Sequence, residues 1–184
     1  MATQFDSLNE SLIKFIDSRH MFFVGSAASE GRVNISPKGM DSLEVISPDR
    51  IVWRNLTGSG NETAGHLAQV NRMTLMWCGF EARPMILRAF GQAKTLHPRD
   101  ADFAELNALF PHSIGARQVF DLKIEMVQSS CGYAVPFFDY QGERDVLETW
   151  AENKGQDGIF EHWSRRNSMT IDGMPTHILD VERV

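Results

Sequence analysis

The chain has 184 residues, of which 42% are hydrophobic and 23% charged, and its formal net charge is −6. This length suits a single globular domain over residues 1–184, and the negative charge argues against nonspecific binding to nucleic acid or acidic membranes. No apolar run approaches the ~18 residues of a membrane span, and the N-terminal segment lacks a signal-peptide pattern, so we expect a cytoplasmic protein.

The first elements are predicted to be a helix and a hairpin of two strands. Apolar residues at helical spacing indicate a helix over 7–17, in which Ser7 and Glu10 form a capping box. A mostly apolar segment over 21–27 indicates a strand. A Ser-Glu-Gly turn leads from it into a second strand that begins at Arg32, so we expect the two strands to pair.

The second strand alternates apolar and polar residues. Because successive side chains of a strand point to opposite faces, Val33 and Ile35 share one face, which we expect to be core. The other face is polar and is a candidate binding surface. It carries Asn34, Ser36 and, just past the expected strand end, Lys38.

A glycine-rich connection follows the next predicted strand. This strand covers 51–55, residues 57–60 form a flexible link, and a helix runs over 62–70 with Asn61 at its N-cap. A helix start offers unpaired backbone amides and the positive end of the helix dipole, so the connection can hold a phosphate. The alternative is that the glycines only join a strand to a helix. The candidate phosphate loop comprises Gly58, Ser59, Gly60, Asn61, Glu62 and Thr63, with the Glu62 carboxylate directed outward.

The middle of the chain continues the antiparallel pattern. Strands over 73–80 and 84–95 are expected to pair as a hairpin, and a helix is expected over 98–110. A further strand follows, with one face buried and one solvated. Its buried face is predicted to carry Phe120, Leu122, Ile124 and Met126.

The last part is predicted to be a helical extension that begins at about residue 142. An aromatic-rich strand or loop over 129–139 precedes it. Two helices follow, over 144–154 and 158–166, separated by a stop at Gly155, and the tail is turn-rich. Six or so antiparallel strands with a few helices indicate a mainly β, α+β fold with peripheral helices, a small barrel.

Three cations and one indole are candidates for a shared ligand site. Strand alternation can direct Lys38, Arg54 and Arg88 at one ligand, and a phosphate monoester is commonly bound by one or two such groups. Arg88 interrupts an apolar run, which indicates either a ligand or a structural salt bridge. Trp53 can stack on a planar ring, although a core position is the alternative.

Other kinds of site have little support in the sequence. No two of the six histidines show the spacing of a helical metal pair, and no serine or cysteine has a nucleophile pattern. We therefore predict no metal site and name no catalytic residue. Cys78 and Cys131 are expected to be reduced core thiols.

Over residues 10 to 140, these runs resemble the pyridoxamine 5′-phosphate oxidase-like family of FMN-binding split β-barrels. The resemblance is carried by a strand that ends in lysine, RVNISPK, and by the helix-starting segment VWRNLTGSGNET. A third match is the hairpin of TLMWCGF and ILRAFG. It implies an antiparallel split β-barrel that binds FMN. The implied FMN contacts are Asn34, Ser36, Lys38, Asn55, Asn61, Thr63 and Arg88.

The resemblance also implies a homodimer with flavin at the subunit interface. The segment from Tyr133 to Pro136 would approach the flavin of the partner subunit. The chain departs from the family at two points: the usual Ser-Arg-Lys run at the helix start is replaced by Asn-Glu-Thr, and the C-terminal Arg-x-His element is missing. Oxidation of vitamin B6 is therefore not expected.

Several functions remain open at this level. The first is an FMN-dependent oxidoreductase that takes electrons from a nicotinamide or from a small substrate. The second is a flavin-binding or ligand-binding module without turnover. The third is a relative that uses haem or a deazaflavin, although haem usually needs an axial ligand.

Overall fold

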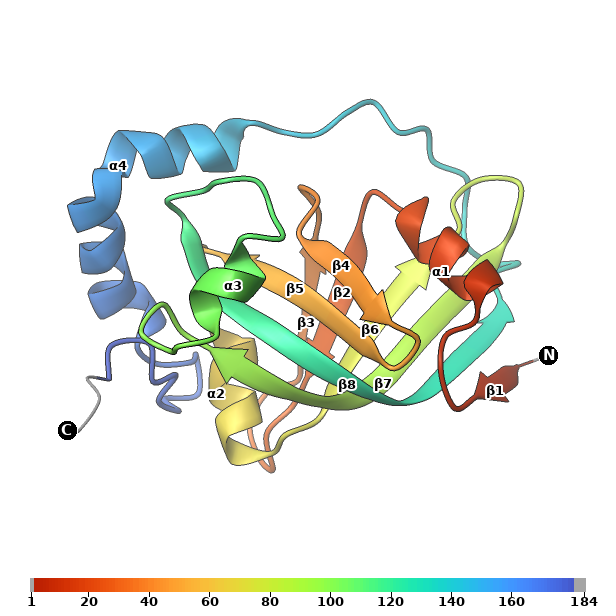
Figure 1. Cartoon of the computed structure of the whole chain (residues 1–184), viewed down its shortest axis with the longest axis horizontal. Coiled ribbons are helices and arrows are strands. Elements are labelled where there is room, and N and C mark those ends of the chain that lie inside the picture. Colours follow the sequence, from red (N-terminus) through yellow and green to blue (C-terminus); the bar gives the residue numbers. More distant parts are fainter. Residues whose placement is uncertain (1, 181–184) are drawn as a thin grey trace.

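The sheet that organises the molecule is antiparallel, strongly curved and eight-stranded (Figure 1). The computed structural model describes residues 2–180. The strand order is β3-β2-β6-β7-β8-β5-β4, and β1 pairs with β8. The strands are β1 (Thr3–Phe5), β2 (Phe22–Ser26), β3 (Asn34–Lys38), β4 (Leu43–Ser47), β5 (Arg50–Leu56), β6 (Met73–Cys78), β7 (Met85–Leu96) and β8 (Ala116–Cys131).

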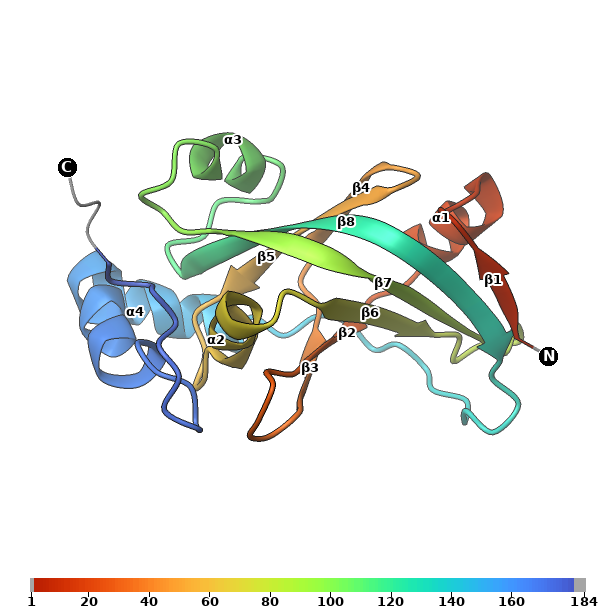
Figure 2. The ribbon, with the colours of Figure 1, turned by 90° about the horizontal axis from the view of Figure 1, so that it is seen from below.

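Helices surround this sheet, and two of them complete its core. α1 and α2 lie toward opposite ends of the curved sheet (Figures 1 and 2), and both contribute apolar side chains to the cluster around Trp53 and Leu75. α3 covers a second cluster, which contains Val52 and Val119. The helices are α1 (Glu10–Asp17), α2 (Glu62–Gln69), α3 (Phe103–Asn107), α4 (Val146–His162) and the π-helical turn η1 (Trp163–Asn167).

The predicted fold class is confirmed, with an open sheet. In the part of the chain that the structure describes, no ladder joins the edge strands β3 and β4. The predicted hairpins β2–β3 and β6–β7 are both present. β4 was not predicted; its register with β5 is interrupted between Val45 and Ser47.

The prediction that the apolar face of β3 is core is wrong. Val33 and Ile35 are 69% and 70% exposed. β3 is an edge strand that pairs only with β2, so its alternation cannot tell which face will be covered. The polar face turns inward instead.

The predicted alternation of β8 fails at a β-bulge. Phe90 pairs with Met126, but Gly91 pairs with Ile124, so the register shifts between them. The extra residue shifts, by one position, which residues of the strand face the core. Val127 is therefore fully buried, whereas Met126 is only partly buried.

Two helices have other ends than the sequence predicts. The Asn9 side chain caps α1 by accepting from the Leu12 amide at 3.0 Å, so the predicted capping box of Ser7 and Glu10 is wrong. The helix expected over 98–110 is shortened to α3. The predicted break at Gly155 is confirmed, since this residue has φ 65° and ψ 171° within α4.

Candidate functional site

The polar face of β3 meets β5 and the start of α2. Asn34 donates to the Thr63 hydroxyl at 3.3 Å, and Lys38 donates to the Asn55 side-chain oxygen at 3.3 Å. Ser36 lies between them on the same face, opposite Val24 of β2. Five of the predicted contact residues are thus brought together. Asn34 and Lys38 are four residues apart, about 13 Å along a strand, so this polar face is elongated.

Lys38 is the cation at the far end of this polar face. Burial, together with the nearby charge of Arg117, lowers the pKa of its ammonium group to about 8. Its Nζ atom also lies 5.6 Å from the centroid of the Trp53 ring. Trp53 itself is 0% exposed and stacks on Phe120 with a centroid distance of 4.5 Å, so the structure places the indole in the core.

Asn61 occupies the N-cap position of α2, as expected, but its side chain makes no capping hydrogen bond. Its Nδ2 atom donates to the Asn167 carbonyl at 3.1 Å, and its buried Oδ1 atom has no protein partner within the described residues. Glu62 points toward the C-terminal segment, where its carboxylate accepts from the Ile171 amide at 3.1 Å. The start of α2 therefore has no side-chain cap of its own.

Two further polar residues, which were not predicted from the sequence, reach this region from β8. Gln118 is 0% exposed, and its Oε1 atom accepts from Asn55 at 3.2 Å. Its Nε2 atom has no protein partner among residues 2–180. Arg117 is 2% exposed and donates to the Gly60 carbonyl at 2.8 Å. The available signal was two consecutive polar residues, followed by Val119, just before the alternating run that begins at Phe120.

The other predicted cations lie elsewhere. Arg54 packs over the Phe110 ring and donates to the Pro111 carbonyl beneath α3. Arg88 lies on the opposite face of β7 from the buried Leu87 and donates to Ser130 at 3.3 Å. The structure thus brings only Lys38, of the three cations, to the polar face of β3.

Tyr133 and Pro136 lie in the segment that leaves β8. Tyr133 is 84% exposed, and Pro136 is also exposed. Neither side chain reaches the polar face of β3 within the same chain. Their predicted role toward a partner subunit stays a prediction.

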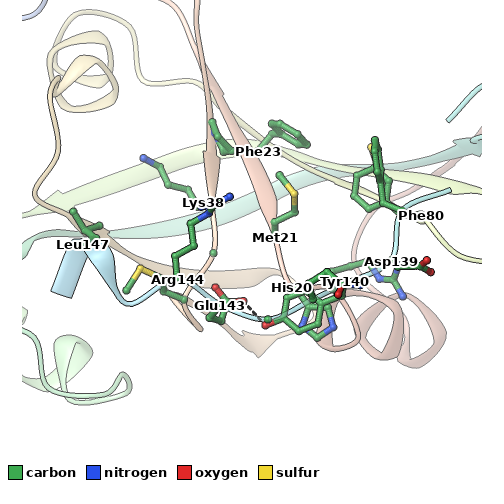
Figure 3. Close-up of a pocket in the computed structure, with 18 of the residues that line it drawn as sticks. His20, Met21, Phe23, Lys38, Phe80, Asp139, Tyr140, Glu143, Arg144 and Leu147 are labelled. Carbon is green, nitrogen blue, oxygen red and sulfur yellow. Dashed lines mark hydrogen bonds between the residues drawn. The ribbon is translucent and has the colours of Figure 1, made fainter. Parts of the chain in front are cut away.

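A cavity of about 1000 Å³ opens beside Lys38 (Figure 3). It lies between the β2–β3 end of the sheet and the segment that leads into α4. The Gly58 to Thr63 loop is not part of its lining. The lining is largely apolar and includes Met21, Phe23, Pro37, Met40, Phe80, Phe138, Val146, Leu147 and Trp150.

One wall of this cavity is held by aromatic contacts. Tyr140 stacks on His20 with a centroid distance of 3.6 Å and donates to Glu143 at 2.9 Å (Figure 3). Phe138 donates its amide to the Phe80 carbonyl at 3.2 Å, and the two rings meet edge to face. Because these partners are far apart in sequence, the cavity had no signature in the sequence.

The C-terminal segment forms hydrogen bonds with the start of the glycine-rich loop. Asn167 donates to the Gly58 carbonyl at 3.0 Å, and His162 Nε2 lies 3.1 Å from the same oxygen. The Trp163 indole donates to the Thr57 hydroxyl at 2.8 Å. The predicted helical extension thus supports the candidate phosphate loop.

Among residues 2–180, no cluster of three or more His, Cys, Asp or Glu side chains is arranged to hold a metal. No helix in that range is long and apolar enough to cross a membrane. Cys78 and Cys131 are free thiols, but Cys131 is exposed, so the expectation that both are core thiols is wrong.

Comparisons with known proteins agree with this fold. The family model described as pyridoxamine 5′-phosphate oxidase matches residues 8–131. The family protein ustO of Aspergillus flavus is 34% identical over 93% of this chain and 76% of its own length.

Two solved structures share the fold at low sequence identity. A candidate pyridoxamine 5′-phosphate oxidase from Lactobacillus delbrueckii has 17% identity and a TM-score of 0.55, covering 67% of this chain and 94% of its own. A protein from Clostridium acetobutylicum, related to a general stress protein of the pyridoxinephosphate oxidase family, has 14% identity and a TM-score of 0.51. It covers 67% of this chain and 91% of its own.

Proposed function

Because the chain belongs to the pyridoxamine 5′-phosphate oxidase family, we propose that it is an FMN-binding flavoprotein that acts as an oxidoreductase. The observation that carries this proposal is the elongated polar face of β3, which runs from the start of α2 to Lys38. Its ends match the two ends of FMN: amides, hydroxyls and a helix start suit the phosphate, and an apolar cavity suits the ring.

Unpaired polar atoms support the proposal that this region holds a polar ligand. The buried Gln118 Nε2 and Asn61 Oδ1 atoms have no protein partner among residues 2–180. Buried polar groups are normally paired, so such atoms mark a place where a ligand or water completes the site. The residues that would hold FMN are Asn34, Ser36, Lys38, Asn55, Asn61, Thr63 and Gln118.

FMN would supply the redox chemistry, and the protein would bind and orient it. The charge of Lys38 would favour electron density on a bound ring. The cavity beside it, at the upper end of the ~300–1,000 Å³ typical of ligand sites, leaves room for a second reactant. We propose that this reactant is a nicotinamide donor or a small redox substrate.

We also propose that the protein is a homodimer. The exposed Val33 and Ile35 border a hollow of about 430 Å³ on the outer face of β2, β3 and β6, with Phe23 and Met76 in its lining. An apolar hollow on an open sheet face suits a second copy of the chain.

The visible spectrum of the purified protein, with FMN added in excess, tests the cofactor. We expect flavin absorption bands and quenched FMN fluorescence on binding. In the protein as purified, a Soret band would indicate haem instead. Absorption bands of a deazaflavin in that sample would indicate a deazaflavin cofactor. Absence of FMN binding would contradict the proposal.

Turnover needs a separate measurement. We expect NADH or NADPH to bleach the bound flavin under anaerobic conditions, and oxygen or another acceptor to restore its absorption. A bound flavin that no nicotinamide or small reductant reduces would support a binding module without turnover.

A further inference from the structure

The first turn of α2 supplies no cation for a phosphate. Residues 61–63 read Asn-Glu-Thr, so the first turn of α2 carries a negative side chain and no cation. A phosphate dianion held there still needs a compensating charge. We infer that Arg117, from β8, provides this charge beside Gly60 and thereby selects a phosphorylated flavin over an unphosphorylated one.

A β-bulge places Arg117 at this position. Asn55 pairs with Gln118, but Leu56 pairs with Ala116, so Arg117 is the extra residue of the bulge. Bulges redirect side chains and are common beside functional sites. Here the Arg117 Nη1 atom donates to the Gly60 carbonyl at 2.8 Å, which puts the guanidinium directly against the loop.

Among residues 2–180, the burial of Arg117 is compensated only in part, by the hydrogen bond to the Gly60 carbonyl and the nearby charge of Glu62. The side chain is 2% exposed, its Nε atom has no partner, and no carboxylate among residues 2–180 forms a salt bridge with it. Burial lowers the pKa of its guanidinium to about 9, and the Glu62 charge opposes this only in part. A buried charge is costly unless it is paired, so an anionic ligand is the missing partner.

The loop that Arg117 contacts through the Gly60 carbonyl is suited to an anion. α2 spans eight residues, its N-cap side chain leaves the first-turn amides free, and its dipole adds positive potential there. Gly58 has open space around the position of a Cβ atom. The start of α2 and the Arg117 guanidinium, which contacts the Gly60 carbonyl, thus belong to the same loop region, which suits a phosphate monoester.

This inference rests on the proposed FMN binding, and comparing two flavins separates the two claims. Dissociation constants for FMN and for riboflavin, which lacks the phosphate, can be measured by fluorescence quenching on the full chain. Arg117→Gln is expected to weaken FMN binding by roughly ten- to a hundredfold, the worth of a hydrogen bond to a charged group, and riboflavin binding little. Arg117→Lys, which keeps the charge, should retain part of the preference.

Arg54→Gln is the matched control. Arg54 is also a buried arginine of the same sheet with an unpaired Nε atom, but it donates to Pro111 under α3. The Arg54→Gln variant should leave the ratio of FMN to riboflavin affinity unchanged, whatever the effect of the substitution on stability.

The outcomes discriminate clearly. If the wild-type chain binds neither flavin, the proposed function fails and this inference fails with it. If the wild type binds FMN but Arg117→Gln keeps its preference, or loses both flavins equally while folded by circular dichroism, only the role of Arg117 is overturned. Should Arg117→Gln not fold, Arg117→Lys decides, and an equal loss of both flavins in that variant overturns the inference.

Discussion

Lys38 combines a partly buried ammonium with a polar partner and an aromatic neighbour. Its Nζ atom donates to Asn55 and lies over the Trp53 ring, and its pKa is lowered to about 8. The lowered pKa means that Lys38 loses its proton in the free protein just above neutral pH. Because a hydrogen bond from the ammonium to a polar atom of the bound ring favours the charged amine, ligand binding should raise this pKa again.

FMN affinity is therefore expected to fall as pH rises from 7 to 9. Below about 8 the ammonium is charged before binding, whereas above it binding must take up a proton. The second pKa of the phosphate, near 6, lies below this pH range, so the phosphate charge stays nearly constant. Fluorescence titrations at several pH values measure the effect, which should reach several-fold.

Lys38→Met is the control for this pH effect. It should bind FMN more weakly at pH 7, and its affinity should change much less up to pH 9. Parallel pH profiles for the variant and the wild type would show that another group titrates. The charged or titratable side chains near Lys38 are Arg117 and, in the cavity lining, His20, Glu143 and Arg144. Of these, Arg117 has a pKa lowered by burial to about 9.

At the scale of elements, bulges in β8 position the site. The bulge against β7 requires Gly91, because a Cβ atom there would lie 2.0 Å from the Lys123 carbonyl oxygen. The clash is with backbone, which cannot move without breaking the ladder between β7 and β8. The bulge against β5 places Arg117 at the loop. These two irregularities set the twist and register of the longest strand.

Gly91→Ala is expected to destabilise the protein by more than about 2 kcal/mol. Gly58→Ala is the comparison, because a Cβ at Gly58 meets nothing within 4 Å, and its change should stay within about 1 kcal/mol. Urea unfolding followed by circular dichroism measures both. Equal stabilities of the two variants would show that β7 and β8 adapt to the added methyl group.

At the scale of the whole molecule, the exposed outer face of the sheet is the surface on which the proposed dimer rests. Val33 and Ile35 are more than two-thirds exposed on an edge strand, although edge strands are usually protected. Large exposed aromatic residues, Phe137 and Phe138, follow β8 on the segment beside the cavity. A second copy of the chain would cover such surfaces.

Ile35→Glu is expected to shift the protein from dimer to monomer, because dimerisation would bury the new charge without a partner. Sedimentation velocity measures the molecular mass. Ile171→Glu serves as control, since Ile171 is equally exposed, at 72%, but lies in the C-terminal tail. A monomeric wild type, or a dimer that persists in Ile35→Glu, would contradict this interface.

The sequence by itself determined most elements and the polar face of β3. Local periodicity identified both hairpins, the helix after the glycine-rich loop and the break at Gly155, because each depends on residues near one another in the chain. The sequence also singled out Asn34, Ser36, Lys38, Asn61 and Thr63 as candidate ligand-binding residues. Asn55 came from the family resemblance.

Only the tertiary structure decided what covers each face. Alternation separates the two faces of β3, but strand position at the sheet edge leaves Ile35 exposed and turns Lys38 inward. The bulge that brings Arg117 beside Gly60 depends on the register with a distant strand. The stacking of His20 on Tyr140 likewise joins segments far apart in the chain, and no local pattern encodes such pairings.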